Sequence, residues 1–211
     1  MPAKTANCPN CGAPVEFLWS AAVQTTCPYC KSIIVRRDVN WQKVGEIADL
    51  PLDASPIQIG AEGVYRQKAF VVVGRIIYEY ERGGWNEWHL AFNDGTSGWL
   101  SDAQLDFAIS FQHAPPSPLP PAGNLQPMQT FAWFNQQYSV TTITVANYAG
   151  VQGELPFEYW DKSKVTFADL KSPDAHFATI DYSESTPLLF VGESIEYDAL
   201  QLKNVRLFEK W

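Results

Sequence analysis

Hydrophobic and polar positions alternate along much of this chain with the two-residue period of β-strands. Residues 85–92 show the pattern most clearly, because one side carries large apolar residues, namely Trp88, Leu90 and Phe92. The other side carries Glu87 and His89. Since successive strand side chains point to opposite faces, we expect the apolar set to be buried and Glu87 and His89 to face outward.

Strand signals of other kinds occur from residue 55 to residue 111 and resume after residue 124. β-branched and aromatic residues, which favour strands, dominate residues 70–80 and 139–146. Asp94-Gly95 suits a tight hairpin turn because both residues tolerate positive φ angles. Weaker strand signals cover residues 164–170, 176–182 and 188–191. The pattern predicts no long helix, and residues 200–211 fit either a closing strand or a short amphipathic helix.

A proline-rich stretch at residues 114–123 interrupts the strand signals. It holds five prolines in ten residues and should form an extended polyproline II spacer. We interpret it as a stiff connector within the β region. A docking site for a proline-recognising domain is the alternative.

All four cysteines lie near the N-terminus, in the pairs Cys8-Pro-Asn-Cys11 and Cys27-Pro-Tyr-Cys30. Two such tight turns can present four thiolates in the tetrahedron that zinc prefers, and the spacing fits four-cysteine zinc sites. We therefore predict one structural zinc ion per chain, bound by Cys8, Cys11, Cys27 and Cys30. A closed site of four thiolates has no open coordination position for catalysis.

Other uses of the two cysteine pairs are two disulfides, a thioredoxin-type redox pair or a rubredoxin-type iron site. Disulfides are disfavoured because residues 1–8 show no secretory signal. A redox pair would normally precede a helix in a βαβ unit, and no such helix is predicted.

These patterns predict a mainly β protein with an N-terminal zinc ribbon in residues 1–40. An antiparallel β-barrel or sandwich follows, for which two SH3-like halves are one arrangement. The halves would be residues 55–113 and 124–211, joined by the connector 114–123.

Charge is unevenly distributed along the chain, whose formal net charge is −8. The first 44 residues carry five basic and two acidic side chains, whereas the remainder carries ten basic and twenty-one acidic ones. An acidic body of this kind repels phosphate backbones, so we expect no nucleic-acid binding. A nucleic-acid-binding ribbon that uses Lys31, Arg36 and Arg37 is the alternative. The apolar runs are too short to span a membrane, and the expected compartment is the cytoplasm.

Three residues are candidates for chemistry in the β region. Glu87, His89 and Glu154 could serve an enzyme or a small-ligand receptor if a barrel mouth brought them together. No histidine has metal-ligand spacing to another or lies beside a nucleophile in the sequence, so we expect no catalytic residue. For Glu154, which lies in Gly153-Glu-Leu-Pro156, we expect either a purely structural place in a turn or a carboxylate that caps loop amides.

The segments Phe70-Val-Val-Val-Gly-Arg-Ile-Ile-Tyr78 and Trp85-Asn-Glu-Trp-His-Leu90 carry a family resemblance, together with Asp94-Gly95, Trp99-Leu100 and the later Gly153-Glu-Leu-Pro156. They resemble the bacterial domain-of-unknown-function family 4178 over about residues 55–205. The resemblance implies a bacterial protein often joined to a zinc ribbon, and one family unit that includes the proline-rich stretch. It also implies an accessory partner of an envelope-stress or membrane-associated complex, and it supplies no catalytic residue.

Taken together, the sequence predicts a non-enzymatic zinc-ribbon adaptor that binds protein partners in the bacterial cytoplasm. A nucleic-acid-binding ribbon protein and a ligand-binding or enzymatic barrel are the alternatives.

Overall fold

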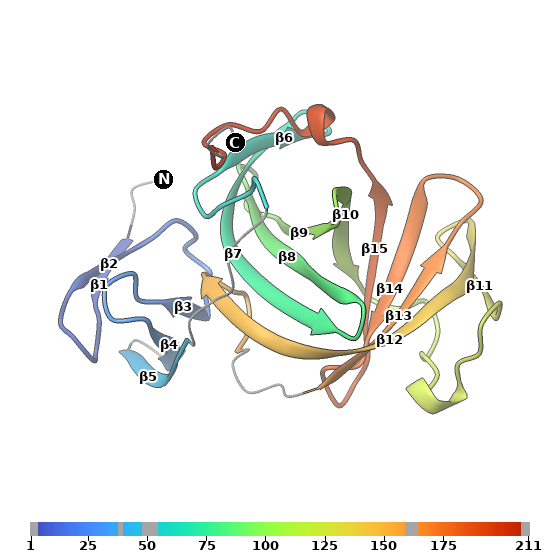
Figure 1. The fold of residues 1–211 in the computed structure, drawn as a ribbon, viewed down its shortest axis with the longest axis horizontal. Helices are drawn as coiled ribbons and strands as arrows, with labels where there is room; N and C mark the ends of the chain where they lie inside the picture. The colour runs from blue at the N-terminus through green and yellow to red at the C-terminus, as the bar shows by residue number, and fades with distance from the viewer. Residues whose placement is uncertain (1–3, 38–39, 48–54, 159–163, 208–211) are drawn as a thin grey trace.

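The computed structural model describes residues 4–37, 40–47, 55–158 and 164–207. Almost all of the regular structure in this part of the chain is antiparallel β, arranged as a small N-terminal module beside a barrel (Figure 1). No helix in it has the length and apolar character that a membrane crossing requires.

The N-terminal module, which we call the ribbon, contains two small sheets. Its five strands are β1 (Lys4–Asn7), β2 (Pro14–Phe17), β3 (Gln24–Thr26), β4 (Ser32–Arg37) and β5 (Asn40–Glu46). β1 and β2 form a hairpin, and β3, β4 and β5 form a three-stranded sheet. A core of its own supports the ribbon, in which Val15, Phe17 and Ile34 pack against the buried Cys8 and Cys27.

The barrel is closed by eight antiparallel strands. In spatial order they are β12 (Gln136–Gly153), β13 (Val165–Lys171), β14 (His176–Asp181), β15 (Leu188–Ser194), β10 (Asp106–His113), β9 (Ser97–Ala103), β8 (Gly83–Phe92) and β7 (Lys68–Tyr80). β7 pairs in turn with β12, which closes the ring. The short strands β6 (Glu62–Tyr65) and β11 (Thr130–Trp133) pair with β7 and β12, and two 3₁₀ turns, η1 (Ala122–Asn124) and η2 (Tyr197–Leu200), flank the barrel.

Strands from both sides of the proline-rich stretch share this one barrel, so the expectation of two SH3-like halves is wrong. The reason is β12, a strand of 18 residues whose first part pairs with β13 and whose last part pairs with β7. Register shifts at Val140/Thr142 and Tyr148/Gly150 bend this strand, as β-bulges do, and allow it to follow the curve of the barrel.

The outer wall of the barrel is covered on two sides. One cluster includes Trp88, Leu90 and Phe92, over which the segment containing Ile57 and η2 with Leu200 pack. A second cluster lies outside β12–β15 and is covered by residues 119–133, from the proline-rich stretch through β11. The proline-rich stretch is held there, since Tyr182 donates a hydrogen bond to the Pro120 carbonyl at 2.8 Å. The burial of Trp88, Leu90 and Phe92 confirms the alternation predicted for β8.

The prediction that Glu87 and His89, on the opposite side of β8, face outward was wrong. His89 is 0% exposed and Glu87 is only partly exposed, because in a closed barrel the second face of a strand points into the interior and not to bulk solvent. The C-terminal stretch forms neither a long strand nor a helix over residues 201–207, apart from one bridge between Lys203 and Glu62. Residues 208–211 of that prediction lie outside the described residues.

Candidate functional site

The four cysteines meet at the end of the ribbon, as the sequence predicted. Their sulfur atoms lie within 4.8 Å of one another, with 3.7 Å between Cys8 and Cys30 and 3.8 Å between Cys11 and Cys27. All four are free thiols, and these separations are far longer than the roughly 2.05 Å of a disulfide. A tetrahedral ion with bonds of about 2.3 Å to sulfur places sulfurs about 3.8 Å apart, so the cluster fits a four-thiolate metal site.

Two equivalent turns hold these cysteines. In the first, the Gly12 amide donates to the Cys8 carbonyl at 2.9 Å and Gly12 has φ of +76°. In the second, the Lys31 amide donates to the Cys27 carbonyl at 3.1 Å and Lys31 has φ of 60°. Both turns therefore place a residue with left-handed backbone directly after the second cysteine of the pair, which aims both sulfurs of that pair to the same side.

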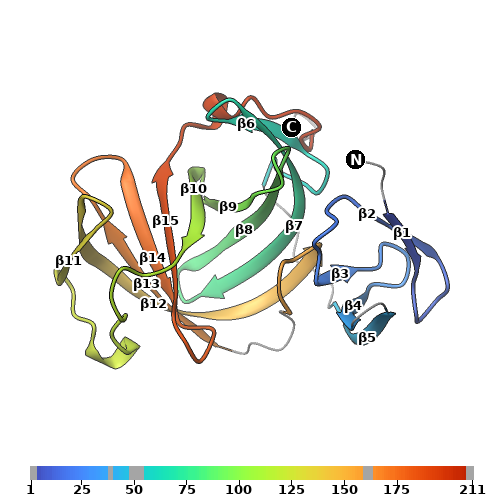
Figure 2. The same ribbon diagram turned by 180° about the vertical axis from the view of Figure 1, so that it is seen from behind.

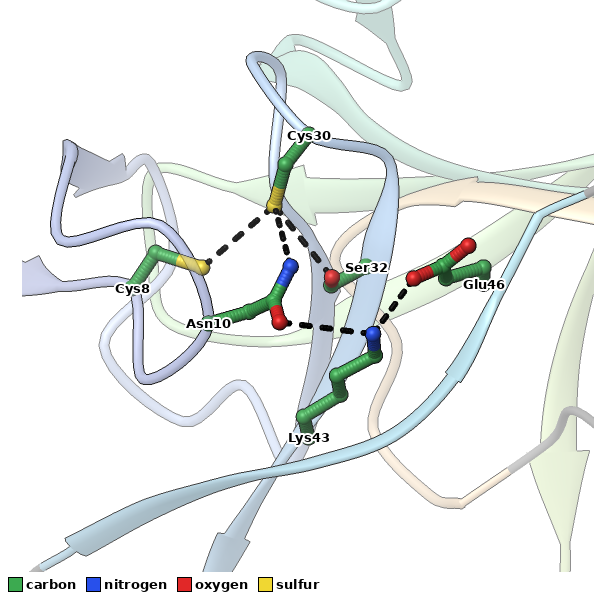
Figure 3. Close-up of polar contacts among 6 residues, drawn as sticks. All are labelled: Cys8, Asn10, Cys30, Ser32, Lys43 and Glu46. Atoms are coloured by element: carbon green, nitrogen blue, oxygen red, sulfur yellow. Dashed lines mark hydrogen bonds and ion pairs between the residues drawn. The ribbon is translucent and has the colours of Figure 1, made fainter.

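A polar shell surrounds Cys30 (Figure 3). Asn10 Nδ2 donates to Cys30 Sγ at 3.5 Å, and Ser32 Oγ lies 3.2 Å from the same sulfur. Lys43 Nζ donates to Asn10 Oδ1 at 3.4 Å and also pairs with Glu46. The hydrogen bonds that Cys30 makes with Asn10 and Ser32 lower the pKa of its thiol to about 5, which favours the thiolate that a metal requires.

The second candidate residue, Glu154, joins the ribbon to the barrel. It follows the last residue of β12, and its two carboxylate oxygens accept hydrogen bonds from the Leu18 amide at 2.7 Å and the Trp19 amide at 2.8 Å. Burial raises the pKa of Glu154 to about 7, although these two amide bonds act in the opposite direction. The expectation that this carboxylate caps loop amides is confirmed, and the loop is in the ribbon.

His89 lies beside this junction. Its Nδ1 is 3.0 Å from the Glu154 carbonyl oxygen, which can only accept, so Nδ1 carries the proton. The ring lies between Trp19 and Trp99, with centroids 4.8 and 5.0 Å away. Burial lowers the pKa of His89 to about 4, so the ring is neutral at pH 7. His89 and Glu154 thus stabilise the contact between the ribbon and the barrel.

The ribbon closes one end of the barrel. Val23 donates to the Leu155 carbonyl at 2.9 Å, and the Leu155 amide donates to the Gln24 carbonyl at 2.9 Å. Ile33 of β4 and Leu155 belong to the apolar cluster that fills the barrel at this end, together with Ile76, Trp99 and other interior residues. Both views of the fold place the C-terminal end of β12 next to β3 of the ribbon (Figures 1 and 2).

The barrel interior is hollow toward its other end. A cavity of about 860 Å³ extends inward from the turns at residues 81–82 and 104–105, and all eight barrel strands contribute to its lining. Glu87 lines it, and cross-strand pairing places Glu87 opposite Ser101 and Ser101 opposite Ala108. The cavity also contains Asp169, which the sequence reasoning missed although it alternates with Phe167 along β13.

Hydrogen bonds from neutral groups fix the two carboxylates. Glu87 accepts from Trp85 Nε1 at 2.9 Å and from Ser101 Oγ at 2.8 Å, and Asp169 accepts from Thr179 Oγ1 at 2.9 Å. Burial raises the pKa of Glu87 to about 7, with a further contribution from the charges of Asp169 and Asp181. Of the three candidates for chemistry, Glu87 lines this cavity, whereas His89 and Glu154 lie at the junction between the ribbon and the barrel.

Comparison with protein families identifies the barrel region. Residues 58–197, about two thirds of the chain, match the domain of unknown function DUF4178. Neither the curated proteins nor the solved structures give a match. The matched range begins before β6 and ends in η2, so it spans the whole barrel and the proline-rich stretch, and the ribbon precedes it. The chain belongs to the DUF4178 family of domains of unknown function.

Proposed function

We propose that this protein is a non-enzymatic binding protein that takes a small ligand into the open end of its barrel. The observation that carries the proposal is the cavity of about 860 Å³ lined by all eight strands. Ligand pockets usually measure about 300–1,000 Å³ and combine apolar walls with a few polar groups. Here Trp85, Phe167 and Phe177 supply apolar surface, and Glu87 and Asp169 supply polar groups.

In this proposal the cysteine cluster binds a structural zinc ion. Four thiolates in a tetrahedral arrangement suit zinc, which would hold the two halves of the ribbon together. The ribbon in turn would keep the barrel closed at the end opposite the cavity. Iron in purified protein would contradict the assignment to zinc.

The proposal can be tested with Nile red, a neutral dye whose fluorescence rises in apolar surroundings. We expect one dye per chain to bind the wild-type protein. Ala108→Trp should abolish binding, because Ala108 lines the cavity and the indole would occupy it. Ala132→Trp is the matched control, since Ala132 is exposed on β11 outside the barrel and should leave binding unchanged. Dye binding that Ala108→Trp leaves intact would contradict the proposal.

As a second function, we propose that the ribbon binds a protein partner, as predicted for an adaptor. One observation favours this proposal. Two large side chains of the ribbon, Leu18 and Tyr29, are 51% and 66% exposed. A partner recovered from the native host should be lost with Tyr29→Ala, while Nile red binding remains. Retention of the partner by Tyr29→Ala would exclude this surface.

Two contacts weigh against the nucleic-acid alternative. Arg37 pairs with Glu158 of the barrel region, and Lys43 pairs with Glu46. These ion pairs reduce the positive charge that the ribbon can offer to phosphates. The cytoplasmic location and the link to an envelope-associated complex stay predictions from the sequence.

A further inference from the structure

We propose that the ligand of the barrel cavity is a small organic cation, in which an ammonium group is attached to an apolar body. This inference rests on the proposed function and names the chemical class of its ligand. It follows from three features of the cavity: its inner carboxylates, its rim and its aromatic walls.

Neither inner carboxylate is held by a hydrogen bond or ion pair from a basic side chain among the described residues. Glu87 is held by an indole N–H and a hydroxyl, and Asp169 is held by a hydroxyl. Among the described residues, neither carboxylate forms an ion pair. Two negative groups in a partly desolvated lumen are unfavourable unless an opposite charge joins them, and a cationic ligand would supply that charge.

The electrostatics of the lumen point the same way. Burial raises the pKa of Glu87, and the charges of Asp169 and Asp181 raise it further. Burial also raises the pKa of Asp169, against the opposing effects of Thr179 and Lys171. An ammonium group between these carboxylates would lower both pKa values and be held by both charges.

The rim of the cavity is electrically balanced. Its charged side chains are all exposed and comprise two bases and two acids, namely Arg82, Lys171, Asp106 and Glu196. Exposed charges are well screened by salt water, whereas the inner carboxylates are screened much less. The net attraction for a cation therefore arises inside the lumen.

Aromatic rings adjoin the carboxylates. Trp85, whose N–H binds Glu87, packs edge-on against Phe167 with a centroid separation of 5.5 Å and against Tyr80 at 5.8 Å. Phe177 and Tyr197 also line the cavity. Ring faces attract ammonium groups and also bury apolar ligand surface, so this wall suits both parts of the proposed ligand.

A metal ion fits this cavity less well than an organic cation. Among the described residues, the four cysteines form the one group of three or more side chains close enough to share an ion. Hard cations such as calcium require six to eight oxygen ligands in about 2.3–2.6 Å contact. Glu87 and Asp169 alone offer no such shell.

The test compares 2-phenylethylamine with 2-phenylethanol by calorimetry at pH 8. The two probes share a phenyl body and differ in having an ammonium or a hydroxyl group. We expect the amine to bind at least tenfold more tightly than the alcohol. Ala108→Trp should remove binding of both. Glu87→Gln and Asp169→Asn should each reduce the preference for the amine over the alcohol severalfold, because each removes one negative charge and keeps the shape.

The dependence on pH provides a second readout. The pKa of Glu87 is raised from 4.5 to about 7, so its carboxylate forms as the pH rises through 7, and amine affinity should rise over the same range. The amine itself stays protonated there, since alkylammonium groups titrate near pH 10. Stability should move in the opposite direction, since a raised pKa favours folding below about pH 4.5 and loses that contribution by about pH 7. At pH 8, Glu87→Gln should therefore unfold at a higher temperature than the wild type while it binds amine more weakly.

The outcomes separate this inference from the proposed function. Equal binding of amine and alcohol, lost with Ala108→Trp, would overturn the cation assignment and leave the ligand-binding barrel intact. Nile red binding without amine binding would do the same. If the wild-type protein binds none of the three probes, both the inference and the proposed function are wrong. If Glu87→Gln does not fold, Asp169→Asn carries the comparison.

Discussion

Cys27→Ser is expected to remove the metal and unfold the ribbon. Cys27 is 0% exposed, and its sulfur lies 3.8 Å from that of Cys11. Zinc binding contributes about 10–16 kcal/mol to the folding of small zinc peptides, so losing one of four thiolates should exceed what the small apolar core of the ribbon can offset. We expect the zinc content to fall from one per chain to nearly zero and the ribbon amides to exchange rapidly with solvent.

The barrel should remain folded in this variant but become less stable. Its two outer clusters do not involve the ribbon, whereas the interior cluster loses the packing of Ile33. Ser20→Ala is the control, because Ser20 is an exposed ribbon residue outside the cysteine turns and should keep the zinc. Slow amide exchange throughout the ribbon of a zinc-free Cys27→Ser protein would contradict this account.

Gly74→Ala is expected to loosen the junction between the ribbon and the barrel. A β-carbon at Gly74 would lie 2.0 Å from the Glu154 carbonyl oxygen, so the backbone that carries Glu154 would have to move. That movement would disturb the hydrogen bonds from His89 to the carbonyl and from Leu18 and Trp19 to the carboxylate. We expect a loss of roughly 3 kcal/mol in the free energy of unfolding, measured by chemical denaturation.

The matched control is Gly123→Ala in η1. A β-carbon there meets nothing within 4 Å, so the free energy of unfolding should change by less than about 0.5 kcal/mol. Equal stabilities of the two variants would show that the close approach of Gly74 to Glu154 does not limit the packing of the junction.

The individual strands could be predicted from the sequence, whereas the way they assemble could not. Composition alone predicted a strand at residues 139–146, and the structure confirms it within the longer β12. The closure of β12 on β7 depends on pairing between residues about 70 positions apart, such as Asn147 with Glu79, and no local pattern encodes it. For the same reason the proline-rich stretch suggested a division between two halves, although it runs along the outside of one barrel.

The candidate site could be predicted where the chemistry is local. The spacing of the cysteines identified the four-cysteine cluster, because each pair forms a tight turn whose geometry depends only on neighbouring residues. Glu87 was recognised as a candidate, but the prediction that it faces outward was wrong. The alternation of apolar and polar residues cannot distinguish a side chain in solvent from one in the lumen of a barrel. Asp169 was missed because its importance comes from sharing the lumen with Glu87, which lies 82 positions earlier in the chain.

Binding of the ligand at the open end of the barrel can be measured through the indole N–H signals in a nitrogen-15 NMR spectrum recorded with and without 2-phenylethylamine. Trp85 lines the cavity and donates its N–H to Glu87, whereas Trp19 and Trp41 belong to the ribbon. We expect the Trp85 indole signal to shift, with saturation at one ligand per chain, while the indole signals of the ribbon stay in place. A shift confined to Trp19 and Trp41, with Trp85 unchanged at saturation, would show that the ligand does not bind at the open end of the barrel.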